Sequence, residues 1–158
     1  MRVLNFDMQQ EVWRRVQASD TPVTPQRAVL PEQLPELIGD EKQDSETYRR
    51  LSYRVQGADR EALRRISAEE ANHARELNTL YYLLTDRCTE LQPRVPKLPT
   101  QLRTALRERC LAEAEGSRAY RRAAEDFPEQ RELFLRLAED EYRHHQTLMR
   151  MLGRYMKD

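Results

Sequence analysis

Apolar residues recur at three- and four-residue spacing along most of the chain, which is the pattern of the buried face of an amphipathic helix. Four such stretches follow one another, and prolines or a glycine separate them. The pattern predicts four helices, over residues 31–55, 59–86, 100–125 and 128–155. In two of these inner stripes a glutamate and a histidine interrupt the aliphatic residues, so the buried face is not purely a packing surface.

The segment between the second and third predicted helices, residues 87–100, carries three prolines and cannot be helical. Fully extended, it reaches at most about 46–50 Å, while a helix of roughly 26 residues is about 39 Å long. The segment can therefore travel the length of a bundle, so that the third helix starts parallel to the second. We expect an all-α four-helix bundle over residues 30–158, built from two helical hairpins joined by one long crossover.

Residues 1–29 form an expected N-terminal arm, with a short amphipathic helix near residues 7–18 that Pro22 and Pro25 would end. Packing of this arm on the bundle or on a neighbouring subunit is the main interpretation, and a helix that recruits a partner is the alternative. The apolar residues that share its face are Met8, Val12, Trp13 and Val16.

Composition narrows the classes of partner. The 27 basic and 27 acidic side chains cancel, so we expect neither nucleic acid nor an anionic membrane as a partner. No apolar run has the length of a signal peptide or a membrane span. Cys88 and Cys110 lack C-x-x-C spacing, which argues against a disulfide framework. A cytoplasmic location is the resulting expectation.

The sequence also repeats itself at an interval of about 72 residues, so that the chain is two copies of one helical hairpin. Neither hairpin alone can bury its apolar stripe. Packing the two about a pseudo-two-fold axis would bring four equivalent inner faces to a common centre. The polar residues that the repeat aligns are Glu41 with Glu113, Tyr48 with Tyr120, Glu70 with Glu141, and His73 with His144.

Residues three apart lie on one face of a helix, so each Glu-x-x-His, Glu70 with His73 and Glu141 with His144, can hold one metal ion. The carboxylates of Glu41 and Glu113, from the other two helices, can bridge. Four ionised carboxylates in a helical core would repel one another and lose their hydration. Two divalent cations would balance their charge, and carboxylate with imidazole suits iron or manganese.

This ligand set is the known set of ferritin-like di-iron and di-manganese proteins, and over residues 31–155 the sequence resembles the rubrerythrin-type branch of that superfamily. The resemblance implies a ferritin-like bundle whose six glutamates and histidines bind two iron ions, with manganese or a mixed pair as alternatives. It also implies that Tyr48 and Tyr120 form hydrogen bonds around the site, while core packing is their other interpretation. Glu69 and Asp140 are expected to be solvated or to pair between helices, with support of a histidine as the alternative.

The resemblance further implies an oxidoreductase that reduces peroxide or dioxygen, has no catalytic residues beyond its metal ligands, and uses an external electron donor. Homodimers are common among such bundles, so a homodimer is a possibility that the sequence leaves open. Rubrerythrins typically carry a rubredoxin domain with C-x-x-C motifs, and a further glutamate three residues after the third-helix ligand. This sequence has no C-x-x-C and has Gly116 at that position. Two alternatives stay open: an iron-binding or iron-handling protein without significant turnover, and a structural bundle with a degenerate site.

Overall fold

The computed structural model describes residues 25–156, which contain four long helices and one short 3-10 helix. These residues include no β-strand, and the prediction of an all-α chain with four helices is confirmed. The short helix expected near residues 7–18 lies outside the described residues. The elements are α2 Pro25–Ser52, α3 Gly57–Thr85, α4 Leu102–Asp126, η1 Pro128–Gln130 and α5 Arg131–Tyr155.

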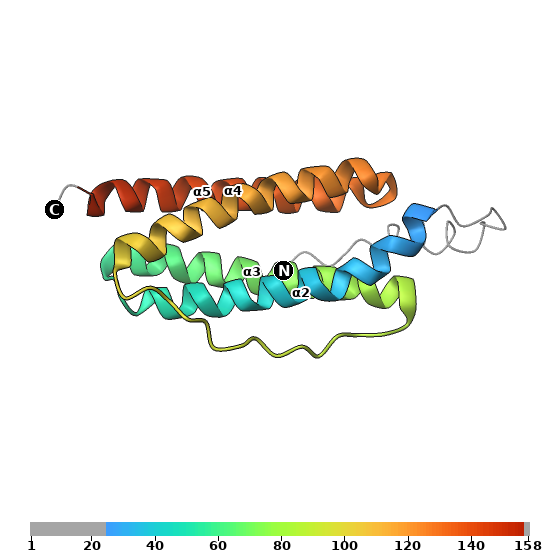
Figure 1. Cartoon of the computed structure of the whole chain (residues 1–158), viewed down its shortest axis with the longest axis horizontal. Coiled ribbons are helices and arrows are strands. Elements are labelled where there is room, and N and C mark those ends of the chain that lie inside the picture. Colours follow the sequence, from blue (N-terminus) through green and yellow to red (C-terminus); the bar gives the residue numbers. More distant parts are fainter. Residues whose placement is uncertain (1–24, 157–158) are drawn as a thin grey trace.

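Two antiparallel hairpins form the bundle: α2 packs against α3, and α4 packs against α5 (Figure 1). The segment between α3 and α4 has no regular secondary structure and runs back along the first hairpin, so α4 starts beside the end where α3 starts (Figure 1). Two side chains hold this crossover: Lys42 Nζ of α2 donates to the Leu91 carbonyl at 2.9 Å, and Arg54, in the turn after α2, donates to the Pro99 carbonyl at 2.7 Å. The expected long crossover is therefore confirmed.

The start of the first long helix differs from the expectation. α2 begins at Pro25 rather than Pro31, so it contains Pro31 and Pro35. Each proline removes a helical N–H donor and is unfavourable within a helix. Leu34 and Ile38, on the same stretch, are completely buried, and their packing against the second hairpin offsets the backbone cost.

Two apolar clusters, one toward each end of the bundle, make up the core. One contains Leu34, Ile38, Leu77, Tyr120, Phe134 and Leu137. The other contains Tyr48, Leu51, Leu63, Leu106, Leu148 and Met151. Between them lie buried glutamates and histidines from all four long helices. The two clusters hold the helices on either side of this polar layer, so its side chains converge on one place.

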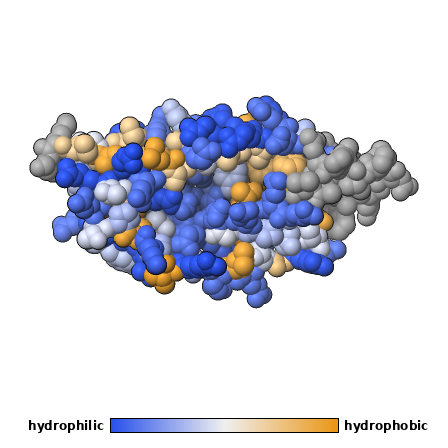
Figure 2. Space-filling model, viewed as in Figure 1, coloured by the Kyte–Doolittle hydropathy of each residue, from blue (hydrophilic) through white to orange (hydrophobic). Residues whose placement is uncertain are grey.

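The outside of the bundle is polar. The face seen in Figure 2 is mostly hydrophilic, with hydrophobic side chains scattered between charged ones. Among residues 25–156, no helix combines the length and the apolar character needed to cross a lipid bilayer.

Candidate metal centre

The structure brings the six candidate ligands together in the middle of the bundle. Each of the four long helices contributes at least one of them, and none is more than 7% exposed. The helical spacing explains this burial, since each residue takes a place in an otherwise aliphatic stripe. The six are Glu41 on α2, Glu70 and His73 on α3, Glu113 on α4, and Glu141 and His144 on α5.

Their ligand atoms form two overlapping groups of four, and within each group all atoms lie within 4.8 Å of one another. Glu70 and Glu141 belong to both groups, while Glu41 with His73 completes one group and Glu113 with His144 completes the other. Glu70 and Glu141 are thus the carboxylates placed to be shared, and Glu41 and Glu113 each belong to one group, whereas the sequence had suggested that Glu41 and Glu113 could bridge. The reason is the packing: α3 and α5 form the main backbone contact between the hairpins, so the carboxylates on these two helices meet at the pseudo-two-fold axis.

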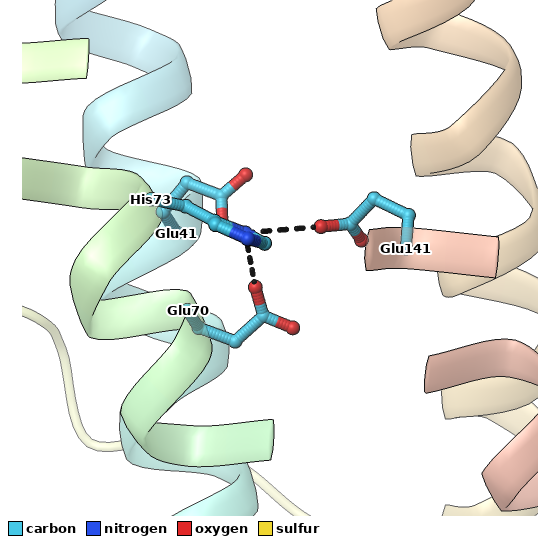
Figure 3. Close-up of side chains that lie close together, drawn as sticks. All are labelled: Glu41, Glu70, His73 and Glu141. Carbon is cyan, nitrogen blue, oxygen red and sulfur yellow. Dashed lines mark ion pairs between the residues drawn. The ribbon is translucent and has the colours of Figure 1, made fainter. Parts of the chain in front are cut away.

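Each imidazole points one nitrogen into the centre. Figure 3 shows His73 between carboxylates that come from α2, α3 and α5. Its Nδ1 lies 3.0 Å from Glu70 Oε2, and 3.3 Å from both Glu41 Oε2 and Glu141 Oε1. In the second group, Nδ1 of His144 lies 3.0 Å from a Glu70 oxygen. The four-carboxylate centre is therefore lined by nitrogen and oxygen lone pairs.

Six of these inward-facing atoms have no hydrogen-bond partner although they are fully buried. Buried polar atoms are nearly always paired, and each unpaired one costs free energy. Oxygen and imidazole donors without partners, gathered in two overlapping groups whose atoms lie within 4.8 Å of one another, suit divalent cations such as iron and manganese. The residues present therefore fit a pair of metal ions. The unpaired atoms are Glu70 Oε1 and Oε2, His73 Nδ1, Glu113 Oε2, Glu141 Oε1 and His144 Nδ1.

The outward nitrogens of the two histidines are held by carboxylates from the opposite hairpin. His73 Nε2 lies 3.1 Å from Asp140 Oδ2, and His144 Nε2 lies 2.6 Å from Glu69 Oε2. A carboxylate accepts here, so one proton is on Nε2, and Nδ1 is the nitrogen whose lone pair becomes available to a cation that displaces its proton. Support of a histidine was only the alternative expectation for Glu69 and Asp140. The sequence does carry a signal for this role: an acidic residue immediately precedes the Glu-x-x-His glutamate in each of the two repeats.

The two tyrosines also link the hairpins. The Tyr48 hydroxyl donates to Glu113 Oε1, and the Tyr120 hydroxyl donates to Glu41 Oε1. Burial raises the pKa of both phenols, so each keeps its proton and remains a donor. Each hydrogen bond engages one carboxylate oxygen and orients the other oxygen toward the centre.

Burial dominates the acid–base behaviour of the shared carboxylates. It raises the pKa of Glu70 to about 7 and that of Glu141 to about 10. Burial lowers the pKa of His144, but the nearby carboxylates of Glu113, Glu69 and Glu70 outweigh this and raise the pKa to about 12. Without cations the centre therefore holds protons at neutral pH, and metal binding has to displace them.

The two halves of the centre are not identical. A Cβ added at Gly116 would lie 3.0 Å from Glu141 Oε2, so any side chain there would press on a shared carboxylate. At the equivalent place in the first hairpin stands Asp44, which forms an ion pair with Arg109. The Arg109 guanidinium lies over the Tyr48 ring at 5.7 Å. Sequence reasoning missed this pair, although the repeat aligns Asp44 with Gly116.

Comparison with known proteins agrees with this geometry. The family model Rubrerythrin matches residues 32–152, a range that covers most of the chain and includes all six candidate ligands. No curated protein and no solved structure matches the chain.

Proposed function

The chain belongs to the rubrerythrin family, and we propose that its six buried glutamates and histidines hold two iron ions that reduce hydrogen peroxide. Reduction of one peroxide to two waters takes two electrons and two protons. When bound, the two ions would supply Lewis acidity and the electrons, and a separate donor protein would return them. The observation that carries this proposal is that six buried ligand atoms without hydrogen-bond partners lie in two overlapping groups.

The chain's own residues have defined tasks in this proposal. Glu70 and Glu141 span both positions and hold the ions as a pair. Asp140 and Glu69 keep the protons of the two histidines on Nε2. The tyrosine hydroxyls hold the terminal carboxylates in place. The apolar clusters at both ends exclude water, which strengthens every electrostatic interaction inside.

Gly116 gives the shared carboxylate of Glu141 room on one side. A change in the charge of the metal pair alters the most favourable arrangement of the carboxylates around it. We therefore assign Glu141 as the carboxylate that shifts, since its neighbour at this point is a backbone without a side chain.

The test is anaerobic loading with ferrous iron, followed by stopped-flow mixing with peroxide. We expect two iron ions per chain and oxidation of both in one fast phase, at a rate well above that of free ferrous iron. Turnover is then measured with a small neutral reductant. Glu70→Ala removes a shared ligand and should abolish the fast oxidation. Glu108→Ala, which removes an exposed glutamate of α4, is the matched control and should not. Peroxide consumption no faster than that by free iron would refute the proposal.

Iron handling without significant turnover is the second candidate, and Gly116 favours it, because rubrerythrins tend to carry a further glutamate at this position. In that case the loaded protein would be oxidised once, slowly, and added reductant would not sustain peroxide consumption. A degenerate site predicts a different result: purified protein that holds well under two metal ions and takes up none on titration.

A further inference from the structure

The repeat creates two equivalent places along the groove between α3 and α5, one beside each histidine. Beside His73, the groove is closed by an ion pair between Arg136 of α5 and Glu76 of α3. Beside His144, the equivalent residues are Arg65 and Thr147. Threonine carries no charge and cannot form an ion pair with an arginine, and the Arg65 side chain forms no ion pair or hydrogen bond within residues 25–156. The duplication has thus left one groove neutralised and the other basic.

The basic groove is also hollow, because Ala62 stands where the other hairpin has Leu133. The hollow has a volume of about 330 Å³ and reaches the ring of His144. Arg65, Arg143 and Arg150 line it together with a single carboxylate, that of Glu69. Arg143 forms ion pairs with Asp140 and Glu69, but the Arg150 guanidinium forms a hydrogen bond only with a threonine hydroxyl among the described residues.

This hollow is connected to the metal centre through His144, whose side chain lines it. His144 turns Nδ1 to the centre, and its Nε2 is one 2.6 Å hydrogen bond away from Glu69. The Glu69 side chain is 43% exposed and lies 3.8 Å from Arg143, whereas Asp140, which has the same place beside His73, is 20% exposed and forms a closer ion pair with Arg143. A redox partner seated on the hollow would be separated from the centre by one carboxylate and one imidazole.

We propose that this basic hollow is the docking site for a small acidic electron-transfer protein, which reduces the centre through Glu69 and His144. The inference rests on the proposed peroxide reduction, to which it adds the surface where the electron donor docks. Each donor molecule gives up one electron and is oxidised, so two encounters return the two electrons that one peroxide consumes. Redox encounters use small, transient interfaces, and complementary charge raises the association rate of such partners by roughly 10- to 1,000-fold at low salt.

The first experiment measures docking without any chemistry. Rubredoxin, a small acidic iron–sulfur protein, is prepared with zinc in place of iron and titrated into the ¹⁵N-labelled, zinc-loaded chain. We expect salt-sensitive NMR shift changes at the residues of the hollow. The affinity measured from these shifts should fall at least about tenfold in an Arg65→Glu/Arg150→Glu variant. The matched control, Arg103→Glu/Arg107→Glu, makes the same charge change at two exposed arginines of α4 and should keep the shifts.

The second experiment follows reduction of the oxidised iron-loaded chain by reduced rubredoxin, relative to reduction by a small neutral reductant. The rate with rubredoxin divided by the rate with the neutral reductant should fall about tenfold in the Arg65→Glu/Arg150→Glu variant but not in the Arg103→Glu/Arg107→Glu control. For the unmodified chain, this ratio should also fall with added salt. No shifts in the hollow, equal ratios in both variants, or insensitivity to salt would each overturn the docking proposal. Inhibition by millimolar phosphate without any effect of donor charge would also overturn it and would indicate a small-anion site. Because the NMR titration needs no iron or peroxide, failure of the proposed peroxide reduction would show separately, in the oxidation assay.

Discussion

Glu70→Gln should stabilise the metal-free protein and at the same time destroy metal binding. The substitution keeps the shape of the side chain and removes its charge. Glu70 is 1% exposed, and its carboxyl has a pKa of about 7 in the fold against a usual 4.5, because of burial. Ionising it above pH 7 therefore costs the folded state about 3 kcal/mol.

The sign follows from the direction of that shift. A raised pKa in the fold means that stability is present below about pH 4.5 and is lost as pH rises through about 7. Without metal, the wild-type protein at pH 8 carries this cost, and the glutamine variant does not. The variant should then melt roughly 6–12 °C higher at pH 8, at 2–4 °C per kcal/mol, while the two proteins should melt alike at pH 4.5.

Metal binding should respond in the opposite direction, because Glu70 belongs to both ligand groups. Ferrous or manganese ions should raise the melting temperature of the wild type strongly and that of the variant little. The assays are thermal unfolding with chelator and with metal, at pH 4.5 and 8, together with metal analysis. Glu41→Gln is the control, since Glu41 belongs to one group only and its loss should spare one position. A Glu70→Gln variant that binds two ions tightly would refute this reasoning. So would a Glu70→Gln variant that is no more stable than the wild type at pH 8 without metal.

Three further results are expected. Metal binding should release protons, more at pH 6 than at pH 9, because Glu70 is protonated below about pH 7; calorimetry in buffers of different ionisation enthalpy measures this, and equal release would contradict it. Gly116→Ala should weaken binding of both ions about tenfold by pressing on Glu141, whereas Gly153→Ala, with nothing within 4 Å, should leave metal titrations unchanged and stabilise α5 by about 0.5–1 kcal/mol. Phe134→Ala should lower the free energy of unfolding by about 3–5 kcal/mol in chemical denaturation, since Phe134 is completely buried.

The helices were predictable from the sequence because their signal is local. Residues such as Leu77 and Leu148 fall at fixed helical spacing from the Glu-x-x-His motifs, and both are completely buried. The three prolines of the crossover exclude helix by their own covalent structure. The first boundary was not predictable in the same way. Proline is favoured at the first turn of a helix, so Pro31 predicts a helix start. However, α2 begins earlier, at Pro25, because tertiary packing of this stretch outweighs the local preference of proline.

The roles within the site depended on the fold. From sequence, Glu41 and Glu113 looked like the bridging pair, since each stands alone on its helix. In the structure the shared pair is Glu70 and Glu141, because α3 and α5 are the helices that meet between the hairpins. Helical spacing places residues around one helix, but it carries no information about which helices touch.

By itself, the sequence determined which six side chains could form the centre, because the repeat and the three-residue spacing are properties of the chain alone. Only the tertiary structure decided how these side chains divide into shared and terminal ligands. It also decided that Asp140 and Glu69 each support the histidine of the opposite hairpin. The physical reason is that a hydrogen bond acts only over a short distance. These contacts join residues more than 60 positions apart in the chain, so a carboxylate contacts its histidine only where packing brings their two helices close together.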